Sequence, residues 1–97
     1  MGPMRDPLLD DAAITVALDT LPGWARSGNE IEKTYECASF PAAISFVVSV
    51  GFAAEAADHH PDLDIRWRRV RVALTTHDSD GLTERDIALA RTIEGIA

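Results

Sequence analysis

The side chains best suited to acid–base chemistry in this sequence are its three histidines. His59 and His60 are adjacent in the stretch EAADHHPDLDIRW, and Pro61 follows them. His77 comes directly after the β-rich segment RVRVALTT. Imidazole gains and loses protons near neutral pH, so grouped imidazoles suit proton transfer. We expect such a group if the strand before His77 ends near the helix before His59.

Carboxylates flank the paired histidines at helical spacing. Glu55 lies four residues before His59, so the two side chains share a face if a helix reaches residue 59. Asp58 directly precedes the pair. A carboxylate beside an imidazole fixes which ring nitrogen carries the proton. Two alternatives stay open at this point: the histidine pair could be incidental, and Glu55 could be an exposed acid at a helix end.

A third carboxylate, Asp86, has a structural explanation as well as a chemical one. The stretch from Thr83 to Asp86, TERD, matches a capping box, in which the acid reaches back to the start of its helix. Pro61, for its part, ends the preceding helix and presents the histidines at the end of an element, a usual place for functional side chains. A capping role and a place in a site are compatible for Asp86.

Metal binding and nucleophilic catalysis are both disfavoured. The histidines together with Asp58 or Asp86 include ligand types that zinc uses. However, adjacent residues seldom direct both imidazoles to one point, and the sequence has no HxH or HExxH spacing. Neither Cys37 nor any serine lies in a nucleophile motif. We therefore expect no metal.

Periodicity and turn signals divide the chain into alternating helical and extended regions. We predict a helix over residues 10–20, strands over 24–26 and 30–37, a helix over 40–58, a β-rich stretch over 63–76 and a last helix from Thr83. Alternation changes phase at Arg68–Arg69, which predicts a tight turn or bulge and hence two strands there. This order predicts one α+β domain spanning residues 1–97, a four-stranded antiparallel sheet with three helices packed on one face.

The long helix over residues 40–58 is apolar on nearly all sides, with Ser45 and Ser49 marking its least apolar side. Such a helix requires cover on more than one side, and in so small a domain the sheet covers only one. We therefore expect a subunit interface, in a homodimer or homotetramer. A charge at Val47 or Val50 is expected to break it.

Four arginines, at positions 66, 68, 69 and 71, lie along the second pair of strands. They indicate a solvated sheet face, with attraction of an anionic partner as the alternative. The chain as a whole has nine Lys and Arg against 16 Asp and Glu, a formal net charge of −7. This balance disfavours direct binding to nucleic acid or to an anionic membrane surface.

Several features predict a cytoplasmic location. Cys37 is the one cysteine, and a lone thiol fits a reducing compartment. The start, MGPMRDPLLDD, lacks the basic and apolar segments of a signal peptide. The apolar run FPAAISFVVSVGFAA is shorter than the roughly 20 residues of a membrane span. We expect residues 1–8 to be flexible, and MGPM has the form of a cloning remnant that could precede a native start at Met4.

The spacing of these residues resembles the signature of the pterin-4a-carbinolamine dehydratase family. The matching pattern is Glu55-x3-His59-His60-Pro61-x5-Trp67-x9-His77-x8-Asp86. GLTERDIALA looks like the family's final helix, and LPGW with WARSGNEIEKTYEC looks like its N-terminal half, so the resemblance covers nearly the whole chain. Trp67 stands where the family also uses Tyr, and Asp80 where a second glycine is common.

The resemblance implies the same four-stranded fold, dimers or tetramers, and loss of water from 4a-hydroxytetrahydropterin to give quinonoid dihydropterin. It implies no metal or bound cofactor. His59 and His77 would be the acid–base pair, and His60 would mainly hold and orient the pterin. Alternatives are a binding, assembly or transcriptional co-regulator protein on the same scaffold, and a related pterin as substrate.

The same resemblance assigns supporting roles to the residues around the histidines. Glu55 and Asp86 would orient or polarise the imidazoles. Asp58 would line the pocket, and Pro61 would shape the loop that presents the pair.

Overall fold

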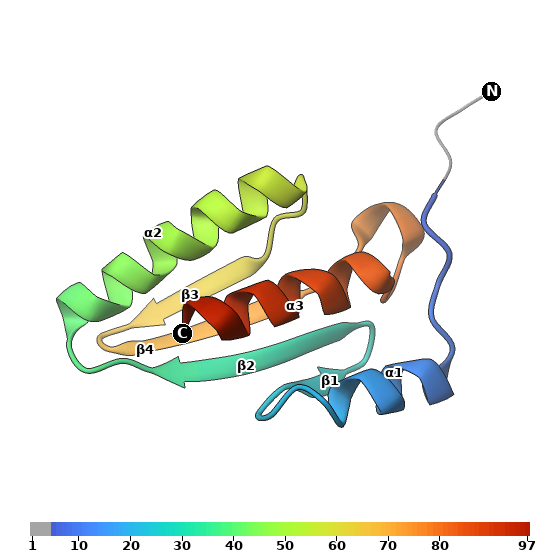
Figure 1. The fold of residues 1–97 in the computed structure, drawn as a ribbon, viewed down its shortest axis with the longest axis horizontal. Coiled ribbons are helices and arrows are strands. Elements are labelled where there is room, and N and C mark those ends of the chain that lie inside the picture. Colours follow the sequence, from blue (N-terminus) through green and yellow to red (C-terminus); the bar gives the residue numbers. More distant parts are fainter. Residues whose placement is uncertain (1–4) are drawn as a thin grey trace.

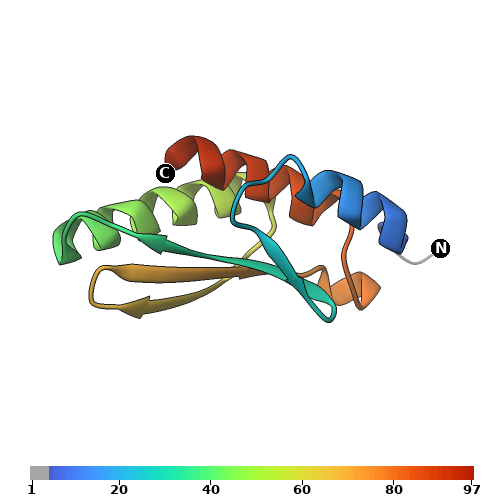
Figure 2. The same ribbon diagram turned by 90° about the horizontal axis from the view of Figure 1, so that it is seen from below.

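Three helices lie on one face of a four-stranded antiparallel sheet (Figures 1 and 2). The computed structural model describes residues 5–97. The elements in order are α1 (Asp11–Leu18), β1 (Ala25–Ser27), β2 (Glu30–Glu36), α2 (Phe40–Ala57), β3 (Asp62–Arg66), β4 (Arg69–Leu74), the 3-10 turn η1 (His77–Ser79) and α3 (Glu84–Ile96). The predicted fold class and element order are confirmed.

The start of the chain was predicted to be flexible through residue 8. Residues 1–4, with the predicted cloning remnant, lie outside the described residues. From residue 5 onward the chain runs along the molecule. The carbonyl oxygen of Asp6 accepts a hydrogen bond of 2.7 Å from the Ser79 hydroxyl, and the amide of Leu9 donates one of 2.9 Å to the Leu82 carbonyl.

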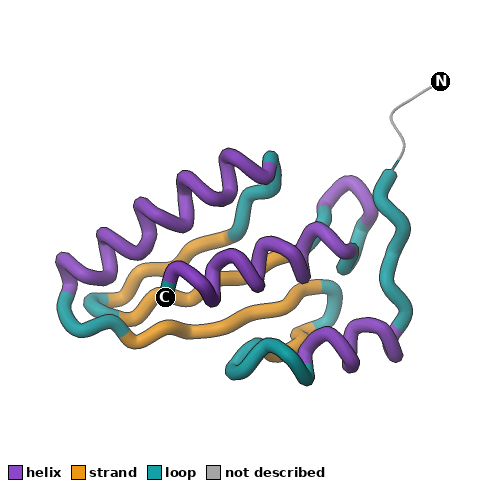
Figure 3. Tube along the Cα trace, in the orientation of Figure 1, coloured by secondary structure: helices purple, strands orange, loops and turns teal. Residues whose placement is uncertain are grey.

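The strand order is β1-β2-β4-β3, so the last two strands form a hairpin and β4 pairs on both sides. Ile31 lies opposite Leu74 and Leu63 opposite Val72, which places their side chains beneath the helices. The predicted phase change proves to be a two-residue turn at Trp67 and Arg68, with Trp67 at a φ of 54°. Figure 3 shows the two hairpins side by side in the sheet, with α2 connecting β2 to β3.

The sequence supplies a cap at the start of each helix. The Asp10 carboxylate accepts from the amide of Ala13, and the Ser39 hydroxyl from the amide of Ala42. Thr83 opens α3 with a full capping box. Each cap satisfies an amide that has no partner within its own helix.

The helix α2 packs on the sheet with one stripe and exposes the opposite one. Ala43, Val50 and Ala54 are buried, whereas Val48 is 53% exposed and Phe52 76% exposed. Val50 belongs to the core of a single chain, so a charge there would disturb the subunit itself and cannot report on an interface, which stays a prediction. The apolar outer stripe itself agrees with the prediction that a sheet covers only one side.

By length and composition alone, α2 could cross a membrane. It has 18 residues, a mean hydropathy of 1.6, and 22% of its residues buried. A single helix that meets this criterion is weak evidence for a membrane span, because the core helix of a soluble protein meets it too. The same composition is typical of a helix that packs on a sheet with one face and against another protein with the other.

The face of the sheet away from the helices carries paired charges. Arg66 binds Asp64 at 3.2 Å and Arg69 binds Glu36 at 3.1 Å. Arg71 pairs with both Glu30 and Glu32. These three arginines are therefore neutralised by carboxylates of the same sheet, which favours the solvated face over attraction of an anionic partner.

A carboxylate near the end of α3 explains why a lysine lies on the apolar side of β2. Glu94 Oε1 accepts from Lys33 Nζ at 2.6 Å, from Trp24 Nε1 at 3.1 Å and from the Tyr35 hydroxyl. Partial burial by itself would raise the pKa of Glu94, but hydrogen bonds from Lys33, Tyr35 and Trp24 outweigh it and lower the pKa below its usual range. Burial raises the pKa of the Tyr35 hydroxyl, and the neighbouring Glu94 carboxylate raises it further. The hydroxyl therefore keeps its proton and remains a hydrogen-bond donor.

Replacing Glu94 with glutamine is expected to lower the free energy of unfolding at pH 7 by about 1–2 kcal/mol, because the charge that strengthens these hydrogen bonds is lost. A carboxyl with a lowered pKa stabilises the fold above its unfolded pKa, and the effect is lost as pH falls through the folded pKa. The difference from wild type should therefore shrink below the ordinary value of 4.5.

Urea unfolding at a series of pH values measures this effect. Glu36→Gln is the control, because Glu36 is 60% exposed in its pair with Arg69 and should contribute less than about 0.5 kcal/mol. A Glu94→Gln loss that is the same at pH 7 and at acid pH would contradict the linkage.

Candidate functional site

The three histidines meet at one end of the molecule, where α2 ends, η1 begins and α3 starts (Figure 1). They line a hollow of about 200 Å³. Asp58, Thr76, Asp78 and Arg85 also line it. The condition for grouping the three histidines, that the strand before His77 ends near the C-terminus of the long helix, is therefore met.

The two adjacent histidines point in different directions because of the residue before them. Asp58 ends α2 in the left-handed conformation, with φ 49° and ψ 43°. The chain then turns, so that His59 is buried at 7% exposure while the side chain of His60 is 60% exposed. The expectation that adjacent imidazoles do not converge on one point is consistent with this divergence.

A buried carboxylate, that of Asp86, holds the imidazole of His59. Its Nε2 lies 2.6 Å from Oδ1 of Asp86, which is fully buried. The other oxygen, Oδ2, accepts from the Thr76 hydroxyl at 2.8 Å and from the backbone amide of Thr83 at 2.9 Å. Asp86 thus caps its helix and fixes an imidazole at once, which shows that the two roles assigned to it are compatible.

His60 has a carboxylate partner of its own. Its Nε2 lies 2.8 Å from Oε1 of Glu55, and both side chains are exposed. The pairing of Glu55 with His59, expected from their four-residue spacing, is not formed. The helix ends at Ala57, so the helical spacing does not extend to His59.

His77 faces the other two histidines from the loop after β4. A bridge between Thr76 and Gly81 closes this loop, and Asp80 lies inside it at φ 57°. This left-handed conformation favours glycine, and aspartate is one of the few other residues that adopt it readily. The departure from the family pattern at Asp80 therefore keeps the backbone shape that a glycine would give.

Asp58 lines the hollow as predicted, whereas Pro61 is half-buried just beyond it and shapes the chain toward β3. Sequence reasoning missed Thr76 and Arg85 as parts of the site. Thr76 ends an apolar strand, and Arg85 lies within the capping box, so the local pattern gives each a structural explanation. Their distance from the histidine pair along the chain left no spacing signal.

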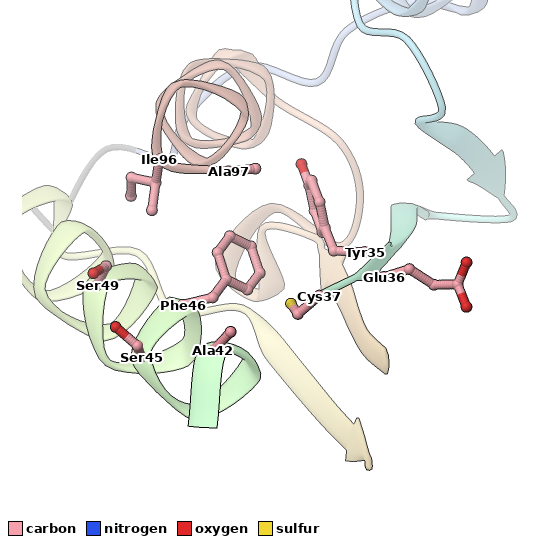
Figure 4. A pocket seen from close by; sticks show the side chains of 9 residues that line it. All are labelled: Tyr35, Glu36, Cys37, Ala42, Ser45, Phe46, Ser49, Ile96 and Ala97. Carbon is pink, nitrogen blue, oxygen red and sulfur yellow. The ribbon is translucent and has the colours of Figure 1, made fainter. Parts of the chain in front are cut away.

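A second hollow, of about 350 Å³, opens between α2, the end of β2 and the end of α3 (Figure 4). Phe46 and Tyr35 contact each other there, with ring centroids 4.8 Å apart, and Cys37 and Ser45 lie nearby. Among the described residues no histidine lines this hollow. This hollow therefore lacks the side chain that is best suited to proton transfer near neutral pH.

Residues 5–97 bring together no group of three or more His, Cys, Asp and Glu side chains that could hold a metal ion. The hollow lined by the histidines instead brings together imidazoles that are hydrogen-bonded to carboxylates. Such a site can donate and accept protons at neighbouring atoms of one substrate.

The molecule is a small α+β protein with a histidine–carboxylate cluster at one end of its four-stranded sheet, and comparison with known proteins identifies the family. The model of the family described as "Pterin 4 alpha carbinolamine dehydratase" matches residues 7–96. The chain therefore belongs to the pterin-4a-carbinolamine dehydratase family, and that name places it among the lyases.

Relatives and a solved structure agree with this assignment. A Roseiflexus sp. (strain RS-1) protein named "Putative pterin-4-alpha-carbinolamine dehydratase" is 59% identical over 88 residues, 91% of this chain and 95% of that protein. A Nocardia farcinica (strain IFM 10152) protein of the same name is 55% identical over 94 residues, 97% and 99% of the two chains. A crystal structure described as a transcriptional coactivator/pterin dehydratase from Brucella melitensis superposes with a TM-score of 0.90 at 33% identity, covering 94% of this chain and 99% of that one.

Proposed function

We propose that this protein catalyses the dehydration of 4a-hydroxytetrahydropterin to quinonoid dihydropterin, by proton transfer from and to its histidines. The observation that carries the proposal is the meeting of His59, His60 and His77 on one hollow, with His59 held by the buried Asp86. Membership of the dehydratase family supports it.

The reaction requires one proton to be given and one to be taken. The 4a-hydroxyl leaves as water once it is protonated, N5 loses its proton, and a double bond forms between C4a and N5. We assign these two transfers to His59 and His77, which line the hollow from α2's end and from η1. Because Nε2 of His59 faces Asp86, Nδ1 is the nitrogen left for the substrate.

His60 and Asp58 are proposed to hold the pterin rather than to transfer its protons. His60 is exposed and is fixed by Glu55, so it can stack on or hydrogen-bond to a planar ring that enters the hollow. We propose that no metal or bound cofactor takes part, because the two proton transfers need only imidazole. We also propose a cytoplasmic location, where the lone thiol Cys37 stays reduced.

A stopped-flow assay of 4a-hydroxytetrahydropterin dehydration, with a chelator present, tests the proposal. Wild type is expected to exceed the spontaneous rate, and His59→Ala/His77→Ala to lose about 10²–10⁴-fold in kcat. Retention of the oligomeric state and of the circular dichroism spectrum would show that the variant remains folded. Unchanged turnover in the double variant would remove these residues from the acid–base role.

The outer stripe of α2 supports a further part of the proposal, a homodimer or homotetramer. The stripe carries Ile44, Val48 and Phe52, all exposed in the single chain, and residues 40–54 contain no charged side chain. Monomeric soluble proteins rarely expose an apolar patch of this kind without a partner.

The same stripe favours a second candidate function, a binding or co-regulator protein on this scaffold. The Brucella melitensis structure described as a coactivator/pterin dehydratase supports keeping this candidate. The dehydration assay separates the two functions. A folded wild type that adds nothing to the spontaneous rate would favour the binding function.

A further inference from the structure

Arg85 occupies an unusual place for a cation. It is the second residue of α3, in the first helical turn, where the partial positive charge of the helix N-terminus disfavours an arginine. Its neighbours Glu84 and Asp86 are the acids that such a turn favours. The guanidinium is therefore poorly placed for its own helix, and its side chain leaves α3 to reach another element.

That element is the C-terminus of α2. Arg85 Nη2 donates to the carbonyl oxygen of Asp58 at 2.5 Å and to that of Ala57 at 3.3 Å. The last turn of α2 carries no basic residue of its own. The carbonyls at a helix end have no partner within the helix, and a cation there is favoured by the helix dipole. Arg85 thus supplies from α3 the cation that the last turn of α2 lacks.

The capped turn leads directly into the two adjacent histidines. Asp58 holds a left-handed conformation, which aspartate adopts more readily than most L-residues, and this conformation turns the chain out of the helix. The carbonyl that Arg85 holds at 2.5 Å belongs to the peptide bond between Asp58 and His59. Fixing that peptide fixes the direction in which the chain enters His59.

Other residues hold Arg85 in place, and Arg85 lines the histidine hollow. Its Nη1 lies 3.5 Å from the Asp6 carboxylate, and its backbone amide donates to the Thr83 hydroxyl. It borders the same hollow as the three histidines. The adjacent residue, Asp86, holds the His59 imidazole, so two consecutive residues of α3 fix the imidazole and the peptide that precedes it.

We propose that Arg85 is a positioning residue of this site, which clamps the end of α2 so that His59 and His60 keep their place relative to His77. The inference rests on the proposed dehydratase function for its kinetic consequence. It assigns Arg85 no contact with the reacting atoms. The clamp acts through the Ala57 and Asp58 carbonyls.

Arg85→Ala is expected to lower kcat by about 10–100-fold, because a displacement of about 1 Å at a catalytic group has an effect of this size. KM is expected to rise as well, because Asp58 and His60, which are proposed to hold the pterin, lie at the clamped turn. Arg85→Lys restores a cation and one or two donors but not the planar fork, and should fall between wild type and Arg85→Ala. Arg91→Ala is the matched control: Arg91 lies on the same helix and donates to the Thr20 hydroxyl at 2.9 Å, away from the hollow.

A measurement independent of turnover separates failure of the clamp from failure of the proposed function. The His59 amide donates to the Ala54 carbonyl at 3.1 Å in the turn that Arg85 holds. Its hydrogen exchange, followed by NMR, should be at least tenfold faster in Arg85→Ala and unchanged in Arg91→Ala. Wild type without dehydratase activity would reject the function and leave this test standing.

The proposal is overturned if Arg85→Ala keeps both wild-type kcat and wild-type exchange at His59. It is equally overturned if kcat falls as much in Arg91→Ala as in Arg85→Ala. If Arg85→Ala does not fold, Arg85→Lys decides, because it should show faster exchange at His59 with a lowered kcat. A lysine variant identical to wild type in both readouts would reject the clamp.

Discussion

Asp86→Ala is expected to lower the free energy of unfolding by about 3–5 kcal/mol and to abolish measurable turnover. The carboxylate is fully buried and accepts from the Thr76 hydroxyl and the Thr83 amide while holding Nε2 of His59. Removing it leaves the Thr83 amide and Nε2 of His59 without a partner, whereas the Thr76 hydroxyl keeps its bond to the Thr83 hydroxyl. Each buried polar group left unpaired costs about 1–3 kcal/mol. Because the total stability of a domain is about 5–15 kcal/mol, a loss of this size is a large part of the whole.

Asp86→Asn separates the loss of activity from the loss of fold. The amide has the same size, but its NH2 group must face either the imidazole or the Thr83 amide, and each position sets a donor against a donor or reverses the ring tautomer. We expect a folded protein with kcat reduced at least about 10²-fold. Urea unfolding and the dehydration assay measure the two effects.

Glu84→Ala provides the matched control for both variants. Glu84 is an exposed acid in the same helical turn, so its removal should cost at most about 1 kcal/mol through the helix dipole and leave turnover intact. An Asp86→Ala variant as stable as Glu84→Ala would contradict the buried network.

The order of the elements could be predicted from the sequence because capping and turn residues lie at the element boundaries. Ser39 with Pro41 opens α2, and Thr83 with Asp86 opens α3, and both caps are formed as predicted. The β3–β4 turn followed from a change of phase in the alternation of apolar residues. These signals lie within a few residues of the feature that they predict.

The details of the site depend on contacts that no local pattern contains. The left-handed conformation of Asp58 moves His59 inward, so Glu55 pairs with His60 instead. Periodicity assumes that a helix continues, and aspartate gives no sign of where its φ becomes positive. Arg85 contacts the end of α2 across 27 residues of sequence. From its local sequence alone, Arg85 would be predicted to be an ordinary exposed arginine.

The same limit applies to which stripe of α2 faces the sheet. Its apolar residues surround the helix, so the hydrophobic pattern could not distinguish Val50, which is fully buried, from Val48, which is 53% exposed. The sheet's own geometry decides this, through the register of β4 beneath the helix. A test of the proposed subunit interface must therefore use Val48.

Val48→Asp is expected to dissociate the proposed oligomer into monomers. The side chain points away from the sheet, next to the exposed Ile44 and Phe52 on one stripe. A carboxylate in the middle of an apolar interface loses its hydration without gaining a partner, which weakens association by several kcal/mol. Because position 48 is exposed in the single chain, the subunit itself should remain folded.

Sedimentation velocity over a range of concentrations measures the change in mass, and Val16→Asp is the control. Val16 is also apolar, lies in the helix α1 and is 67% exposed, but it is remote in sequence from the α2 stripe. It carries the same helical cost of aspartate. Dissociation by Val48→Asp and not by Val16→Asp would place the interface on α2. A wild type that sediments as a monomer would show that the stripe serves a different partner, as the binding function requires.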